Sequence, residues 1–186
     1  MGIVQERIQE SIDVKRRILN DPVLLKQIEN SAQMLRATLD HGGKILFCGN
    51  GGSAADAQHL TAEFVGRFQR ERKAMAAVCL NANVSSLTAI ANDYSYDFVF
   101  ARAVEALMKP EDVLVGISTS GNSENVYRAV LKAKKIGGKT ISLLGKNGGK
   151  IKDMSDIPII VPSDCTARVQ EAHILIGHII CEMVED

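Results

Sequence analysis

The sequence lacks the features of a membrane or secreted protein. No apolar run reaches the roughly 20 residues that a transmembrane helix needs, and the first residues, 1–7, become polar too soon for a signal peptide. The four cysteines, Cys48, Cys79, Cys165 and Cys181, are widely scattered, and no pair has the C-x-x-C spacing of common zinc and redox motifs. We therefore expect reduced thiols, a cytoplasmic protein and no membrane partner.

An excess of charge of either sign is also absent. Lys plus Arg and Asp plus Glu number 22 each, so the formal net charge is zero. A basic tract that would favour nucleic acid and an acidic tail that would favour disorder are both missing. The sequence also lacks linkers, internal repeats and low-complexity segments. Its 186 residues, 46% of them apolar, suit one compact domain with one core. We expect a single domain over residues 1–186 and no nucleic-acid partner.

Short apolar runs alternate with helical patterns along the chain. The runs lie at 44–48, 76–80, 113–117, 139–144 and 157–161. Helical periodicity covers 3–19, 22–39, 53–66, 84–107, 123–136 and 166–184. This alternation predicts a three-layer α/β fold with a five-stranded parallel sheet covered by helices on both faces.

Two helices precede this alternation. Residues 1–41 hold them, and the α/β core follows at 44–186. Asp21 is the expected N-cap of the second helix, with Pro22 in its first turn. Both helices have broad apolar faces, which could pack on the sheet or on another subunit. The sequence favours the second arrangement slightly.

A hydroxyl-rich loop follows the third apolar run. The run 113–117 ends in Ser118-Thr119-Ser120-Gly121-Asn122-Ser123, and a helical pattern begins at Glu124. Helix N-termini have unpaired N–H groups and partial positive charge, so four hydroxyls beside one form a phosphate cradle without Lys or Arg. The alternative is an ordinary N-cap in a serine-rich turn. Nucleotide-binding glycine motifs are absent here, which indicates a single terminal phosphate, as on a phosphosugar.

A second loop of similar design follows the first apolar run. The segment 44–48 ends in Gly49-Asn50-Gly51-Gly52-Ser53, where three glycines allow a ligand to approach the backbone and Ser53 is the expected N-cap. Ligands of open parallel sheets bind beyond the carboxyl ends of the strands. A lone glycine turn can simply reverse the chain, but two such loops at two strand ends indicate one shared site.

Polar residues on two helices could supply the chemistry. His59 and Glu63 are four residues apart and share a helix face. Gln170 and His178 are separated by roughly 80° around the last helix, so they could converge on a point between two helices. His178 lies among apolar residues, where a histidine is more often packed in the core than catalytic. Glu63 alone would more often be a solvated position, yet in a mostly apolar stretch its carboxylate needs a partner.

In combination, these motifs resemble the phosphoheptose isomerase family of sugar-isomerase (SIS) domain proteins. The matching segments span nearly the whole chain and are Cys48–Ser53, His59–Glu63, Gly66–Phe68, Ala91–Asp93, Gly116–Ser123 and Arg168–His173. The resemblance implies a flavodoxin-like SIS fold and a homotetramer with active sites at subunit interfaces. It also implies conversion of D-sedoheptulose 7-phosphate to D-glycero-D-manno-heptose 7-phosphate, the first step of ADP- or GDP-heptose synthesis for lipopolysaccharide or capsule.

The resemblance also implies roles for individual residues. Glu63 matches the catalytic carboxylate of the family and His178 its catalytic histidine. The positions that hold one zinc ion per subunit in some members are His59, Glu63, Gln170 and His178. The substrate-contacting positions are Asn50, Gly51, Gly52, Ser53, Glu63, Asn92, Asp93, Ser118, Thr119, Ser120, Ser123 and Gln170. Because Gln is a weak zinc ligand, the ligand types alone leave the metal open. Ala167 replaces an Asp of many members, which puts any contact of that Asp in doubt.

An aldose–ketose isomerisation suits these residues. It moves a proton between C1 and C2 through an enediol, with a base for the carbon proton and an acid or base for the oxygens. Glu63 would be the base, and His178 would shuttle a proton. One alternative is a non-catalytic SIS adaptor that binds the replication initiator, but that branch lacks the catalytic Glu and His. Another alternative is a sugar-phosphate-sensing regulator. Such proteins usually carry an additional DNA-binding module, and we expect no room for one in 186 residues with a net charge of zero.

Overall fold

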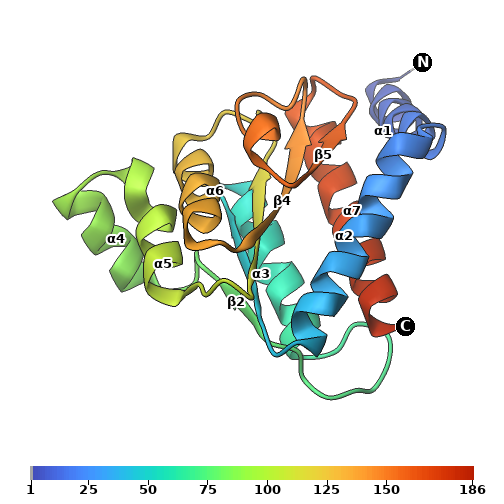
Figure 1. The fold of residues 1–186 in the computed structure, drawn as a ribbon. Coiled ribbons are helices and arrows are strands. Elements are labelled where there is room, and N and C mark those ends of the chain that lie inside the picture. The colour runs from blue at the N-terminus through green and yellow to red at the C-terminus, as the bar shows by residue number, and fades with distance from the viewer. Residues whose placement is uncertain (1) are drawn as a thin grey trace.

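The computed structural model describes residues 2–186, which form a five-stranded sheet between two layers of helices (Figure 1). All neighbouring strands pair in parallel, in the order β2-β1-β3-β4-β5. The strands are β1 (Ile45–Gly49), β2 (Ala77–Cys79), β3 (Val113–Ser118), β4 (Lys139–Gly145) and β5 (Ile157–Val161). The predicted fold class is confirmed.

Burial on both faces explains why the strands read as continuous apolar runs. Successive side chains of a strand point to opposite faces. In β1, Ile45 and Phe47 join one hydrophobic core, while Leu46 and Cys48 join the other. A strand that contributes to two cores has no polar face, so its sequence does not alternate.

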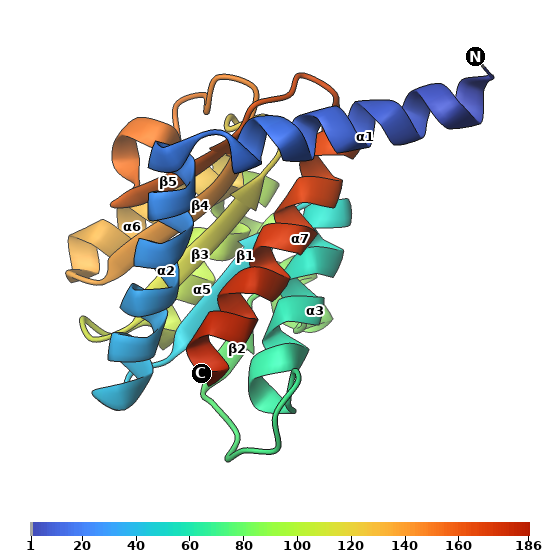
Figure 2. The ribbon, with the colours of Figure 1, turned by 90° about the vertical axis from the view of Figure 1, so that its right-hand side faces the viewer.

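Within residues 2–186, seven α-helices and two short 3₁₀ helices surround the sheet. The helices are α1 (Ile3–Leu19), α2 (Pro22–Asp40), α3 (Gly52–Val65), α4 (Val84–Asp93), η1 (Tyr96–Phe98), α5 (Val99–Leu107), α6 (Glu124–Ile136), η2 (Lys152–Met154) and α7 (Thr166–Glu185). One face of the sheet is covered by α2, α7 and α3, with α7 between the other two (Figure 2). The opposite face is covered by α5 and α6. No helix within residues 2–186 is long and apolar enough to cross a membrane.

The two leading helices differ in how they use their apolar faces. α2 begins as predicted, because the Asp21 carboxylate accepts the N–H groups of Val23 and Leu24. The apolar face of α2 packs on its own sheet through Leu24, Ile28, Ala32 and Leu35. Of the two predicted arrangements, α2 therefore has the packing on its own sheet, and a contact of α2 with another subunit stays a prediction.

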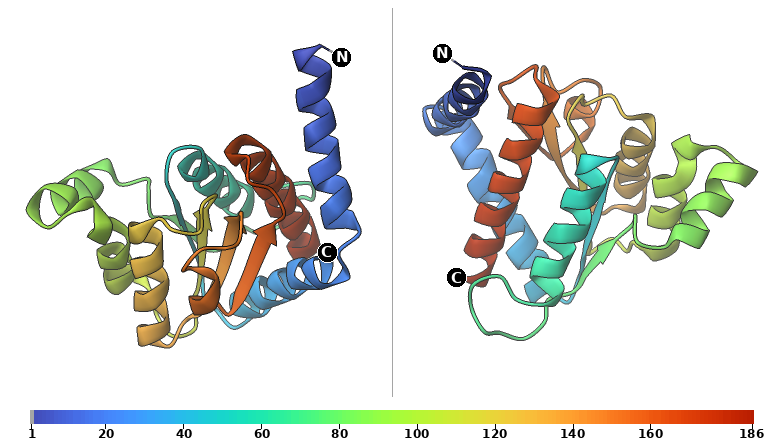
Figure 3. Two further views of the ribbon diagram at one scale, coloured as in Figure 1. Left: turned by 90° about the horizontal axis from the view of Figure 1, so that it is seen from above. Right: turned by 180° about the vertical axis from the view of Figure 1, so that it is seen from behind.

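By contrast, α1 keeps much of its apolar surface open. It buries Val14 and Ile18 alone and leaves Ile3, Val4 and Ile8 more than half exposed, at 62%, 67% and 56%. It extends beyond the rest of the molecule (Figure 2 and Figure 3). The open face of α1 is available to a partner of matching apolar character.

The predicted helix at 84–107 is wrong because the structure divides it. α4 ends at Asp93, η1 follows, and α5 begins at Val99. At the break, Ser95 has an extended backbone (φ −173°, ψ 166°) and its hydroxyl accepts the N–H of Asp97. A serine side chain that binds a nearby N–H competes with helical hydrogen bonding. The apolar period continues across this break without Gly or Pro, so the pattern did not reveal it.

The strand order determines where a site can form. The sequence runs outward from β1 in one direction to β2 and in the other to β3, β4 and β5, so the order reverses between β1 and β3. In doubly wound sheets, the crevice at such a reversal binds the ligand. The glycine-rich loop after β1 and the hydroxyl-rich loop after β3 lie on the two sides of this point.

Candidate active site

A pair of amide side chains connects the two loops. Asn50 Nδ2 donates to Asn125 Oδ1 at 2.8 Å, and Asn125 Nδ2 donates to Asn50 Oδ1 at 2.9 Å. Tyr96 Oη donates to the same Asn50 oxygen at 2.9 Å. The two loops thus form one surface at the carboxyl edge of the sheet. Neither Asn125 nor Tyr96 was identified from the sequence, because their pairing with Asn50 depends on the order of the strands and on the break at Ser95.

The helix after the glycine-rich loop has its N-cap two residues earlier than predicted. The N-cap of α3 is Gly51, with a positive φ of 57°, and the expected N-cap role of Ser53 is wrong. Ser53 is instead buried in the first turn. A Cβ on Gly49 would come within 2.6–2.8 Å of Ser53. Gly51 therefore provides the positive φ at the turn, and Gly49 allows close packing against Ser53. As a result, Ser53 lies inside the helix and not at its N-cap.

The hydroxyls of the second loop gather at the start of α6. Ser118 Oγ lies 2.9 Å from Ser123 Oγ and 3.5 Å from Ser120 Oγ. Ser120 Oγ also accepts the N–H of Asn122 at 3.1 Å. Ser123 has the N-cap position of α6, yet its side chain caps no N–H of that helix. The ordinary capping alternative is therefore not what the structure has. Among the described residues, the N–H of Val126 donates to Asn125 Oδ1 at 2.9 Å, whereas no side chain accepts the N–H groups of Glu124 and Asn125. These two N–H groups at the start of α6 remain available to an anion.

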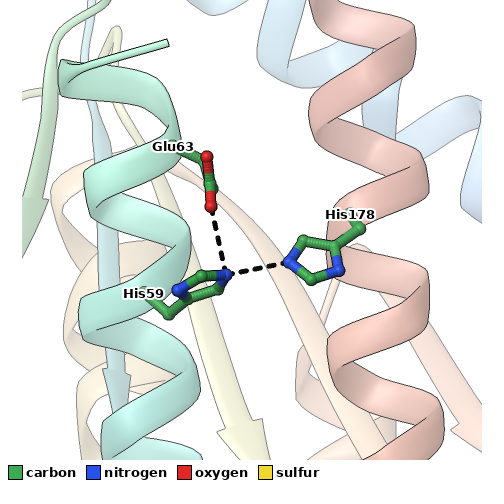
Figure 4. Close-up of side chains that lie close together, drawn as sticks. All are labelled: His59, Glu63 and His178. Carbon is green, nitrogen blue, oxygen red and sulfur yellow. Dashed lines mark hydrogen bonds and ion pairs between the residues drawn. The ribbon is translucent and has the colours of Figure 1, made fainter. Parts of the chain in front are cut away.

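Three of the predicted functional side chains meet between α3 and α7 (Figure 4). His59 Nε2 lies 2.9 Å from His178 Nε2 and 3.1 Å from Glu63 Oε1. The ring of His178 also stacks on Phe68, with 5.3 Å between ring centroids. His178 is partly exposed, so the packed-core interpretation does not describe it.

That packed-core interpretation fits His173. This side chain is fully buried and its Nε2 lies 2.9 Å from the carbonyl oxygen of Leu144. Burial lowers the pKa of His173 to about 4, which the contact with Leu144 only partly opposes. His173 is therefore neutral at pH 7 and has a structural role on the sheet side of α7.

Gln170 approaches the same seam two turns before His178. Its Nε2 donates to Asp56 Oδ1 at 3.2 Å, and its amide lies against Gly52, where a Cβ would come within 2.8 Å of Gln170 Cδ. Asp56 is only 5% exposed. Burial raises the pKa of Asp56, against the opposing effects of Gln170, His59 and His178. Sequence reasoning missed Asp56, although its spacing of three and seven residues from His59 and Glu63 places all three on one helix face.

Two predicted substrate residues lie elsewhere. Asn92 and Asp93 are exposed at the end of α4, where Asn92 Nδ2 donates to Asp93 Oδ1 at 3.0 Å. Within residues 2–186, no hydrogen bond joins either side chain to the two loops. Ala167 is exposed in the first turn of α7. The next residue, Arg168, donates to Glu171 at 2.6 Å and to the carbonyl oxygen of Arg7 at 2.9 Å, which connects α7 to α1.

The meeting point of the three side chains has the composition of a metal site. One ligand atom from each of His59, Glu63 and His178 lies within 4.8 Å of the other two. In a tetrahedral zinc site with ligands at ~2.0–2.1 Å, neighbouring ligand atoms are separated by about 3.4 Å. Two imidazoles and a carboxylate also match the ligand set of known catalytic zinc sites, which keep further positions open. These residues therefore fit a zinc ion.

A carboxylate at the end of α7 holds the loop that carries Phe68. Glu185 accepts the N–H groups of Phe68 and Gln69 at 2.8 Å, that of Arg70 at 3.1 Å, and Arg72 Nε at 2.8 Å. Burial acts to raise the pKa of Glu185, but these donors outweigh it and lower the pKa to about 2.

Arg72 extends this arrangement to α3. Its guanidinium donates to the carbonyl oxygens of Glu63 at 2.7 Å and of Phe64 at 2.9 Å. The Arg72–Glu185 pair, with side chains 13% and 2% exposed, thus joins the ends of α3 and α7. His59, Glu63 and His178 lie on these same two helices, so the pair helps to fix their separation.

Proteins similar to this chain in sequence and in fold are known. A family model described as the SIS domain matches residues 10–145. The phosphoheptose isomerase of Clostridium acetobutylicum is 53% identical over 184 residues, which cover 99% of this chain and 94% of that protein. The chain belongs to the phosphoheptose isomerase family. The predicted family is confirmed, and the chain is a phosphosugar isomerase.

Solved structures of family members have the same fold. The phosphoheptose isomerase from Neisseria gonorrhoeae matches with a TM-score of 0.91 at 45% identity, covering 98% of each chain. The one from Francisella tularensis matches with a TM-score of 0.92 at 37% identity, covering 97% of this chain and 95% of that one. These relatives give no support to the adaptor alternative.

Proposed function

We propose that this protein converts D-sedoheptulose 7-phosphate to D-glycero-D-manno-heptose 7-phosphate, the first step in making ADP- or GDP-heptose for lipopolysaccharide or capsule. The observation that carries the proposal is the meeting of Glu63 with two imidazoles between α3 and α7, two helices that pack side by side, the first of which begins at the loop after β1. Family membership supports it, since the relatives are named for this activity.

The hydroxyl-rich loop would bind the phosphate. Ser118, Thr119, Ser120 and Ser123 offer hydroxyls at the start of α6, where backbone N–H groups and the helix dipole also favour an anion. The loop after β1, with Asn50, Gly51, Gly52 and Ser53, would bind the sugar. The amide pair between Asn50 and Asn125 keeps the two loops at a fixed separation, which selects for the length of the substrate.

The proton transfers would fall to Glu63 and His178. A base removes a proton from C1 of the ketose, which gives the enediol, and returns it to C2 to give the aldose. Glu63 would act as this base, because it is a carboxylate with 18% of its side chain exposed at the cluster. His178 would move the proton between the two oxygens. Asn92 and Asp93 remain proposed substrate contacts and would have to approach from α4.

The chain would also hold one zinc ion per subunit. His59, Glu63 and His178 would bind it, with Gln170 as a further oxygen ligand. When bound, the ion would act as a Lewis acid that polarises the substrate carbonyl.

The protein would act as a homotetramer in which active sites lie at subunit interfaces. The exposed apolar side chains Ile3, Val4 and Ile8 of α1 support this assembly. Residues 1–186 would be one SIS domain, with 1–41 used in packing and assembly and 44–186 as the α/β core. For α2, the packing is within the chain.

Incubation with sedoheptulose 7-phosphate tests the function directly. The aldose should appear in the NMR spectrum of the mixture, and its formation should require Glu63. The matched control is Glu71→Gln, because Glu71 is 89% exposed on the loop after α3. Absence of the aldose, both with and without added zinc, would reject the proposal.

A further inference from the structure

Asp56 is a buried carboxylate with an incomplete set of partners. It is 5% exposed, its Oδ1 accepts one hydrogen bond from Gln170, and its Oδ2 is buried without a partner among the described residues. Burying a carboxylate in this way is costly, because its remaining lone pairs lose their water. Leu or Ala would fill a helix–helix seam at lower cost, so the presence of Asp indicates a purpose beyond packing.

The contact between Asp56 and Gln170 fixes the direction of an amide. An ionised carboxylate can only accept hydrogen bonds, so the group that faces it must be the Gln170 NH₂. Gly52 leaves room for this amide, because a Cβ there would come within 2.8–3.0 Å of Gln170 Cδ, Nε2 and Oε1. Gln170 Oε1 therefore points away from Asp56, and in the described part of the chain it receives no hydrogen bond.

We propose that Asp56 is a positioning residue that turns the Gln170 amide so that its oxygen faces the active site as a ligand. The proposal rests on the proposed isomerase function and deepens it. Donation of the NH₂ group to a carboxylate also increases the electron density on the amide oxygen, in the way that carboxylates improve histidine ligands. A weak ligand type, Gln, would thereby become a better donor to a zinc ion or to a substrate hydroxyl hydrogen.

Asp56→Asn tests the direction of this hydrogen bond. Asn has nearly the same shape, but its amide can either donate or accept, so the Gln170 amide is free to turn over. Loss of a group that orients a ligand typically costs ~10–100-fold in metal affinity or activity. We expect a decrease of that size in kcat/KM, and in the zinc affinity of the metal-free protein, measured by competition with a chelator.

Reversing the pair gives a sharper test. When Asp56→Asn is combined with Gln170→Glu, the new amide at position 56 can donate to one oxygen of the new carboxylate at position 170. The second carboxylate oxygen then faces the site, and the total charge is unchanged. We expect this double variant to recover at least tenfold in kcat/KM over Asp56→Asn. Gln170→Glu alone places two carboxylates together, so its kcat/KM should be lower than that of Asp56→Asn and lower than that of the double variant.

Asp112→Asn is the matched control. Asp112 is 1% exposed and accepts the N–H groups of Lys44 and Lys109, but it lies at the opposite edge of the sheet, before β3. Asp112→Asn should lower the melting temperature and leave kcat/KM and zinc affinity unchanged. If Asp56→Asn behaves in the same way, or if the double variant recovers nothing, the positioning role is wrong while native turnover still supports the isomerase. If the native protein neither forms the aldose nor binds zinc, both proposals fail.

Discussion

Replacing Glu185 by Gln should destabilise the protein in a pH-dependent way. Glu185 accepts three backbone N–H groups and Arg72 Nε, and only 2% of its side chain is exposed. Gln keeps one acceptor oxygen, but its NH₂ group would place two N–H donors against the backbone N–H groups and the Arg72 Nε–H that now donate to Glu185. It also leaves the Arg72 guanidinium without a counter-charge.

The lowered pKa of Glu185 gives the size of the effect. A carboxyl with an ordinary pKa of 4.5 that falls to about 2 in the folded protein contributes up to about 3 kcal/mol to stability at pH 7. Because the site is near the molecular surface, where solvent screens charges, we expect about 2 kcal/mol. For a chain of this length, that corresponds to a decrease in melting temperature of roughly 4–8 °C.

The sign of the pH dependence follows from the direction of the shift. Since the folded pKa lies below the unfolded one, the contribution is complete above pH 4.5 and is lost as the pH falls toward 2. Urea unfolding at pH 7 and at pH 3 measures it, and the difference between native and Glu185→Gln proteins should shrink by about half at pH 3.

Glu182→Gln is the control for this experiment, because Glu182 is exposed one turn earlier on α7. It should change the free energy of unfolding by less than about 0.5 kcal/mol. A Glu185→Gln protein as stable as this control at pH 7, or a difference that stays the same at pH 3, would refute the reasoning.

Three further predictions concern the site and the assembly. Ser120→Ala removes a hydroxyl donor to a phosphate dianion, which is worth about 1.5–3 kcal/mol, so KM should rise at least tenfold; an unchanged KM would remove Ser120 from the phosphate loop. Glu63→Gln should lower kcat by a factor of ~10²–10⁴ with little change in KM. Adding His178→Gln to Glu63→Gln should lower kcat by a smaller factor than His178→Gln does alone. If the migrating substrate proton still exchanges with solvent in Glu63→Gln, a different residue is the base. Removal of residues 2–20 should leave a folded protein with a smaller assembly by light scattering, since α1 buries only Val14 and Ile18; an unaltered assembly would contradict the role of α1.

The sequence predicted most of the sheet and helices because their signals are local. Each strand is a buried apolar run. The glycines after β1 and the hydroxyl residues after β3 indicate that a strand ends there and a helix begins. The break at Ser95 was missed because a serine hydroxyl ended α4 while the apolar period continued. The N-cap of α3 was misplaced because Ser53 fits a cap by residue type, whereas the positive φ of Gly51 allows the helix to start earlier.

The site was predictable in part for a related reason. His59 and Glu63 share one helix, so their spacing alone placed them together. The partners of Gln170 and Glu185 lie more than 110 residues away in sequence, and only the packing of α7 on α3 brings them into contact. Periodicity within one helix carries no information about which residue of another helix it will face.

The position of α7 has a consequence for how the chain is made. The twenty residues of α7 lie between α2 and α3 and supply His178, Gln170 and Glu185. While the ribosome still holds this segment, the sheet face beneath it stays uncovered, and transiently exposed apolar surface of this kind favours aggregation. Because α7 follows all five strands in the sequence, this face of the core and the catalytic cluster are completed last, and a deletion of α7 would remove both together.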